Sequence, residues 1–252
     1  MPEMLYSAYH EILYRPLFNG LIFIYSLLPF PDLGLAIISL TVLVRILLFP
    51  ATAKMFKSQA AMRSLGPKIK EIQEKYKEKK DEQARRLMEL YAQEKVNPFS
   101  GCLPILVQLP LLIALYNVFW RGLSPLDVSA LYSVVAVPEF FSATMFGIVS
   151  LTEKNYIIGF LAGASQFLQA RLVPQPESLT LRSAKPHEPD LSKILSLQMK
   201  YFFPVLITIW SFSLPAALPL YWTIMNLLAI VEQIWLRKKF KEPGIKNQVQ
   251  NG

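Results

Sequence analysis

The chain has 252 residues, of which 53% are hydrophobic and only 17% are charged, and its mean hydropathy is positive. This balance argues against an ordinary soluble domain and predicts a protein with several membrane spans. A single cysteine excludes an intramolecular disulfide, and two distant histidines argue against a histidine metal site. The formal net charge of +8 has to be located before it is interpreted.

Five apolar runs have the composition of membrane-spanning helices, which need about 17–25 residues. In chain order they are residues 33–49, 103–120, 156–173, 201–214 and 218–236. The fourth run is short and leads almost directly into the fifth through SFSLPAALP. Two prolines in this stretch favour a tight reversal, so we expect the last two spans to form a hairpin.

The positive charges indicate the orientation of the spans, because cytoplasmic loops are enriched in Lys and Arg. Residues 51–97 carry 12 of the 26 basic residues, residues 171–200 carry five, and the chain after residue 236 carries five more. Five spans with the N-terminus outside place all 22 of these in the cytoplasm. A span at the apolar stretch 131–151 would move ten of them outside, so that stretch is interpreted as an outer loop.

A second ambiguous stretch, residues 17–31, ends in Pro-Phe-Pro. We interpret it as an amphipathic or interfacial helix on the outer side. A sixth span here would only move the N-terminus inside, so this alternative stays open.

Residues 52–96 are polar and highly charged, unlike the rest of the chain. Two helical stripes of apolar residues run through them, at positions 65, 69, 72 and 76 and at positions 84, 87, 88 and 91. A charged stretch at 79–81 separates the stripes, which predicts an antiparallel helical hairpin. The hairpin is either a solvated connector or a docking arm whose net charge suits anionic lipid headgroups or RNA.

The sequence lacks the usual motifs of an intramembrane enzyme. It has no His-Glu-x-x-His, no aspartate pair within a span, no Ser/Lys or Ser/His dyad in an apolar context and no glycine-rich phosphate loop. We therefore expect no enzyme activity, no catalytic residue, no metal and no other cofactor. The predicted spans carry amide, hydroxyl and indole groups instead. Singly, such groups usually form hydrogen bonds between helices, but several facing one another indicate a wetter site.

Arg45 lies inside the first predicted span, where an arginine is unfavourable by about 2.5–3.5 kcal/mol or more. It precedes Pro50 by roughly 7–8 Å along a helix, so its side chain can snorkel to the cytoplasmic interface. The alternative is a water-filled cavity lined by the polar groups of the other spans. Glu232 is assigned to the cytoplasmic end of the last span, so we expect no internal carboxylate to neutralise Arg45.

Four blocks of the sequence closely resemble the YidC/Oxa family of membrane protein insertases. They are LVRILLFPATAKMFKSQAAM, LGPKIKEIQEKYK, NPFSGCLPILVQLPLLIALYNVF and LPAALPLYWTIMNLLAIVEQIWL. The resemblance implies an all-α polytopic membrane protein of the short bacterial form, without a large periplasmic domain. Its parts are an N-terminal interfacial segment (1–32), a five-helix core (33–236) with a cytoplasmic hairpin (52–96) and a cytoplasmic loop (174–199), and a basic tail (237–252).

The resemblance also implies a function. The protein would insert and help to fold proteins of the bacterial plasma membrane, alone or with the Sec translocon, through a hydrophilic groove in which Arg45 attracts acidic residues. The groove residues expected on this basis are Arg45, Gln108, Gln166, Gln169, Tyr221, Trp222 and Asn226. The implied partners are newly made membrane proteins, the lipid bilayer, the Sec translocon and the ribosome, with no specific nucleic acid.

Two other functions remain open from the residues alone. In a small-anion transporter, Arg45 would bind the anion, although the internal repeats typical of transporters are not evident. In a membrane-assembly adaptor, the charged hairpin would be the working part.

Overall fold

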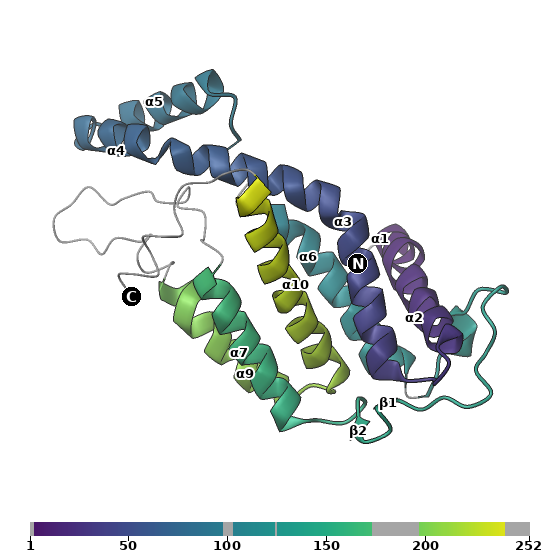
Figure 1. Cartoon of the computed structure of the whole chain (residues 1–252). Coiled ribbons are helices and arrows are strands. Elements are labelled where there is room, and N and C mark those ends of the chain that lie inside the picture. Colours follow the sequence, from purple (N-terminus) through teal and green to yellow (C-terminus); the bar gives the residue numbers. More distant parts are fainter. Residues whose placement is uncertain (1–2, 98–102, 124, 173–196, 240–252) are drawn as a thin grey trace.

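The computed structural model describes residues 3–97, 103–123, 125–172 and 197–239, and this part of the chain is mostly helical. Nearly all of the predicted loop 174–199, and the basic tail beyond residue 239, lie outside the described residues. Figure 1 shows the helices packed side by side, with two short helices extending from one end of the bundle.

The N-terminal residues form a longer helical stretch than the sequence indicates. It comprises α1 (Glu3–Tyr9), the π-helical turn η1 (His10–Tyr14) and α2 (Arg15–Leu27), which follow one another without a break. α2 packs against the next helix, α3, and buries Phe18, Leu21 and Ile22 completely. The predicted interfacial segment is therefore part of the main hydrophobic core.

Helix α3 (Leu33–Ser64) has 32 residues and passes through Pro50 without ending. At 1.5 Å per residue it is about 48 Å long, well beyond a hydrocarbon core of about 30 Å. A proline removes one helical hydrogen bond, and such a loss is tolerated in apolar helices. Residues 52–64 thus continue α3, and only the two helices that follow, α4 (Gly66–Lys75) and α5 (Lys80–Gln93), lie side by side at its end (Figure 1).

A small apolar cluster joins α4 and α5 to the end of α3. Met62, Leu65, Leu87 and Tyr91 are buried in it, and burial raises the pKa of the Tyr91 hydroxyl. The Gln83 amide donates a 2.8 Å hydrogen bond to the Gln73 carbonyl oxygen across the pair. The second predicted stripe is partly wrong, because positions 84 and 88 are exposed and positions 83 and 90 are buried in their place.

The remaining helices correspond in position to the other four predicted spans. They are α6 (Leu103–Asn117) with the π-helical turn η3 (Val118–Gly122), α7 (Tyr156–Leu172), the π-helical turn η6 (Gln198–Phe202) with α9 (Phe203–Ser211), and α10 (Ala217–Lys239). Among the helices of the described residues, α3 and α10 are each long and apolar enough to cross a membrane. α6, α7 and α9 have 15, 17 and 9 residues.

The last two helices do not form the simple hairpin that the prolines suggest. A short turn joins α9 to α10, but each packs mainly against α7 rather than against the other. α7 approaches α9 closely through Gly159 and Gly163, which face Phe212 and Thr208. Such spacing of small residues is a known way to bring apolar helices together.

The described residues between η3 and α7, 123 and 125–155, form no long helix, as expected for a loop rather than a span. They include the short 3₁₀ turn η4 (Val128–Ala130) and an antiparallel pair, β1 (Thr144–Met145) and β2 (Val149–Ser150), which the all-α prediction did not include. The loop is bound to the N-terminal helices. Asn19 donates a 2.9 Å bond to the Ala130 carbonyl, and the Asp32 carboxylate accepts from the backbone N–H groups of Leu35 and Phe146.

Candidate functional site

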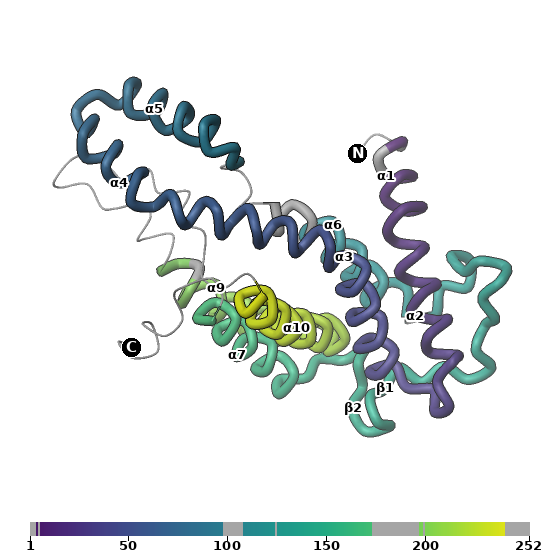
Figure 2. Tube along the Cα trace, turned by 45° about the horizontal axis from the view of Figure 1, so that its top comes forward, coloured from purple at the N-terminus to yellow at the C-terminus, as the bar shows by residue number. Residues whose placement is uncertain are grey.

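Helix α10 lies in the middle of the bundle, between α3 and α6 on one side and α7 and α9 on the other (Figures 1 and 2). It packs most extensively against α7 and α3. Its polar side chains therefore meet those of several neighbours. Among the described residues, four polar contacts that connect α10 to α3, α6 and α7 involve predicted groove residues.

The charged contact joins α10 to α3. Arg45 Nη2 lies 2.9 Å from Glu232 Oε2, and each of the two side chains is only 15% exposed. The prediction that no carboxylate neutralises Arg45 is therefore wrong. Further along the same pair of helices, the rings of Phe49 and Trp235 meet edge to face, with centroids 5.5 Å apart. This ring contact is a second link between α3 and α10, about one helical turn beyond the ion pair.

The three neutral contacts involve five of the predicted groove residues. Gln108 on α6 donates a 2.9 Å hydrogen bond to the Tyr221 hydroxyl. The Trp222 indole donates a 3.0 Å bond to the Gln166 amide oxygen on α7. Asn226 donates a 3.0 Å bond to the hydroxyl of Ser165, which in turn donates to the Ala162 carbonyl.

These contacts form a line along α10 rather than one pocket. Tyr221 and Glu232 are eleven residues apart, which corresponds to about 16 Å along a helix. Six of the seven predicted residues take part in the four contacts. Gln169 is half-buried on α7 and does not belong to them.

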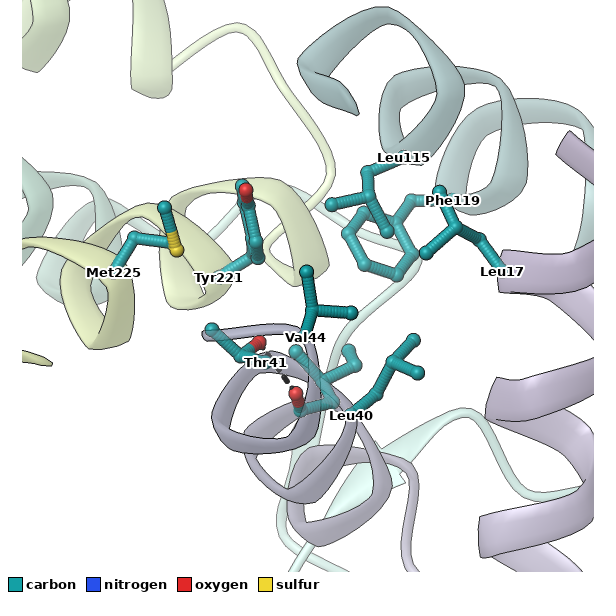
Figure 3. A pocket seen from close by; sticks show the side chains of 9 residues that line it. Leu17, Leu40, Thr41, Val44, Leu115, Phe119, Tyr221 and Met225 are labelled. Atoms are coloured by element: carbon teal, nitrogen blue, oxygen red, sulfur yellow. Dashed lines mark hydrogen bonds between the residues drawn. The ribbon is translucent and has the colours of Figure 1, made fainter. Parts of the chain in front are cut away.

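A small cavity of about 10 Å³ lies beside Tyr221, between α2, α3, α6 and α10 (Figure 3). This volume is close to the minimum for a single water molecule. Its lining is mostly apolar, so it is not the hydrophilic groove expected from the sequence. The lining residues are Leu17, Ile37, Leu40, Thr41, Val44, Leu115, Phe119, Tyr221 and Met225.

The chemistry available at α10 is binding by charge and hydrogen bonds. Within the described ranges, no three metal-ligating side chains come together. A guanidinium in apolar surroundings attracts a carboxylate more strongly than one in water does. The line of contacts can thus accept an acidic or amide-bearing segment if that segment competes with the existing partners.

Sequence reasoning missed two residues of the site, Glu232 and Ser165. A signal for Glu232 was available in the helix positions. Arg45 lies 12 residues after the start of α3, and Glu232 lies 15 residues after the start of α10. Both helices run in the same direction, so the two charges reach similar depths of about 18 and 22 Å (Figure 1).

Comparison with known proteins gives a consistent result over most of the chain. The model of the 60Kd inner membrane protein family matches residues 23–243. A membrane protein insertase YidC from Fusobacterium nucleatum is 35% identical over 208 residues, which is 82% of this chain and 87% of the relative. Proteins of the same name from Actinobacillus pleuropneumoniae and Pasteurella multocida are 33% identical over 237 residues, which is 93% of this chain but 38% of each relative.

Proposed function

Since the chain belongs to the 60Kd inner membrane protein family, we propose that it is an insertase that places newly made proteins in a bacterial inner membrane. The observation that carries this proposal is a charged side chain, Arg45, held largely buried within the apolar part of α3. The relatives do not favour a small-anion transporter or an adaptor that acts through the charged hairpin.

The proposed topology has five spans, with the N-terminus outside and the C-terminus in the cytoplasm. The distribution of basic residues supports it. Together α6 and η3 make a helical run from Leu103 to Gly122, about 30 Å long and sufficient for the hydrocarbon core. The charged helices α4 and α5 lie at the opposite end of α3 from the β1–β2 loop, as this orientation requires (Figure 1).

In the proposed mechanism, Arg45 provides a counter-charge for an acidic residue of the segment that crosses the membrane. It lies about 18 Å from the start of α3, within a hydrocarbon core of about 30 Å. A cation at this depth lowers the free energy of bringing a carboxylate into a medium of low dielectric. The groove residues near Tyr221 and Trp222 would exchange their hydrogen bonds with polar groups of the segment.

Release needs no nucleotide, metal or covalent step. The apolar helix of the substrate partitions into lipid because apolar surface leaves water. The proposed partners are newly made membrane proteins and the bilayer. The Sec translocon and the ribosome are further proposed partners, for which the basic residues of α4 and α5 offer a charged surface.

The test is insertion into liposomes that contain the purified protein. The substrate is a small membrane protein with an acidic outer segment, and wild type is compared with Arg45→Lys and Arg45→Ala. We expect wild type and Arg45→Lys to insert it, and Arg45→Ala to insert it at least about tenfold more slowly, since close charge pairs contribute about 1.5 kcal/mol or more. Neutralising the acids of the substrate should restore insertion by Arg45→Ala.

Two results contradict the proposal. If Arg45→Ala inserts the acidic substrate as well as wild type, Arg45 is a snorkelling anchor and not a substrate-binding residue. If wild type inserts no more substrate than empty liposomes do, the insertase function is wrong, and transport of small anions is the next activity to measure.

A further inference from the structure

Glu232 is the only acidic residue within the five predicted spans. The structure places its carboxylate against the guanidinium of Arg45, with 2.9 Å between Oε2 and Nη2. Both side chains are largely withdrawn from the surroundings, and the Phe49–Trp235 ring contact lies beside them. The residue that the proposed mechanism reserves for a substrate carboxylate is thus already in contact with a carboxylate of the protein.

In the described part of the chain, the contact leaves hydrogen-bonding atoms of both side chains without a partner. Among the described residues, the buried Glu232 Oε2 atom has no hydrogen-bond partner, and neither has the buried Nε atom of Arg45. The strongest arginine–carboxylate pairs have two parallel N–H···O bonds. Arg45 and Glu232 instead have one charged contact without hydrogen-bond alignment. Such a contact leaves N–H donors of Arg45 for a second carboxylate.

We propose that Glu232 is an internal counterion of Arg45 that a substrate carboxylate displaces, so that Glu232 sets how strongly the site prefers acidic segments. The inference rests on the proposed insertase function. In the resting protein, Glu232 compensates a cation that would otherwise be buried without a partner. When an acidic segment arrives, its carboxylate takes the free donors of Arg45, and the like charge repels Glu232.

If Glu232 is a displaceable counterion, its removal should change the insertion of acidic segments but not of neutral ones. With Glu232 present, the pair is neutral, and an incoming carboxylate leaves the site with one net negative charge. After Glu232→Gln the site begins with one net positive charge, and the same carboxylate neutralises it. A segment without charge gains nothing from the change. Substitution of a residue that sets specificity changes the insertion rate of the acidic substrate relative to the neutral one, whereas loss of a purely structural ion pair changes both rates alike.

The experiment compares wild type, Glu232→Gln and Glu139→Gln in proteoliposomes. Two substrates are used, the same small membrane protein with either an acidic or a neutral outer segment, and the quantity measured is the ratio of their initial insertion rates. We expect Glu232→Gln to raise the ratio of acidic to neutral substrate about tenfold, the lower end of what close charge pairs contribute. Glu139 is exposed in the outer loop, so Glu139→Gln removes the same charge far along the chain and should leave the ratio unchanged.

The outcomes separate this inference from the function on which it rests. An unchanged or lower ratio for Glu232→Gln, in a protein that inserts normally and depends on Arg45, overturns the role of Glu232 alone. Failure of wild type to insert, or no effect of Arg45→Ala, overturns both. Glu232→Asp keeps a carboxylate one methylene further back, so it should raise the ratio by less than Glu232→Gln. If Glu232→Gln fails to fold, a lowered ratio for Glu232→Asp overturns the proposal.

Discussion

The close approach of α7 to α9 leads to a prediction with a magnitude. A Cβ atom added at Gly163 would lie 1.6 Å from Thr208 Oγ1, 2.8 Å from Thr208 Cβ and 3.3 Å from the Pro204 carbonyl oxygen. Rotating the threonine does not remove this conflict, because its Cβ and a backbone oxygen are also close, and because Oγ1 donates a 2.9 Å hydrogen bond to the Pro204 carbonyl. Gly163→Ala must therefore move the two helices apart.

Two opposing terms determine the size of the effect. Overpacking of a well-packed interior costs about 1–3 kcal/mol, and a separation of 1.6 Å puts Gly163→Ala at the upper end. Alanine is favoured over glycine within a helix by about 1 kcal/mol, which offsets part of this loss. We expect a net loss of about 2 kcal/mol in the free energy of unfolding, or a melting temperature lower by roughly 4–8 °C for a chain of this size.

The assay is thermal unfolding in detergent micelles, with Gly66→Ala as the matched control. Nothing lies within 4 Å of a Cβ at Gly66, so this variant should be as stable as wild type or more so. Thr208→Ala combined with Gly163→Ala removes the Oγ1 conflict but keeps the Cβ conflict, and it should recover part of the loss. If Gly163→Ala melts like Gly66→Ala, the close packing of α7 on α9 is wrong.

Two further variants test the ends of the bundle and its centre. Asp32→Ala removes the N-terminal cap of α3 and the hydrogen bond that holds the β1–β2 loop. We expect the free energy of unfolding to fall by about 1–2 kcal/mol and the loop to be cleaved faster by proteases. An unchanged rate of proteolysis would contradict this prediction. Asn226→Ala breaks the buried hydrogen bond to Ser165. A double-mutant cycle with Ser165→Ala should give a coupling energy of about 0.6–1.7 kcal/mol. A coupling energy near zero would show that this hydrogen bond does not stabilise the fold.

Apolar composition and periodicity were sufficient to locate most elements of the fold. The run 156–173 coincides with α7, and the run 218–236 lies within α10, because a long unbroken apolar stretch has few other stable conformations. The same reasoning ended the first span at Phe49, since proline usually ends a helix, whereas α3 continues to Ser64. The apolar pattern therefore identifies elements more reliably than it identifies their ends.

Side-chain pairing could not be read from the sequence in the same way. The amides and aromatic residues of the site were recognised as polar groups in apolar surroundings, but their partners depend on the rotation and depth of each helix. The sequence analysis places Glu232 at the cytoplasmic end of the last span and does not pair it with Arg45. Arg45 and Glu232 each lie four residues before the ends of their predicted spans, at 49 and 236, so equal depth alone was a signal for the contact. Gly159 and Gly163 have the small-xxx-small spacing of close helix packing, a signal present in the sequence and not used.

The four contacts along α10 differ in what can displace them. In the three neutral contacts, an N–H group donates to an oxygen at 2.9–3.0 Å, so a polar group of the substrate can exchange for a partner but gains no net free energy by doing so. The contact of Arg45 with Glu232 is ionic and lacks this alignment. A carboxylate from outside can match it in charge and improve on it in geometry. Substitutions in the neutral contacts should therefore change mainly the stability of the bundle, whereas substitution of Glu232 should change which segments the protein inserts.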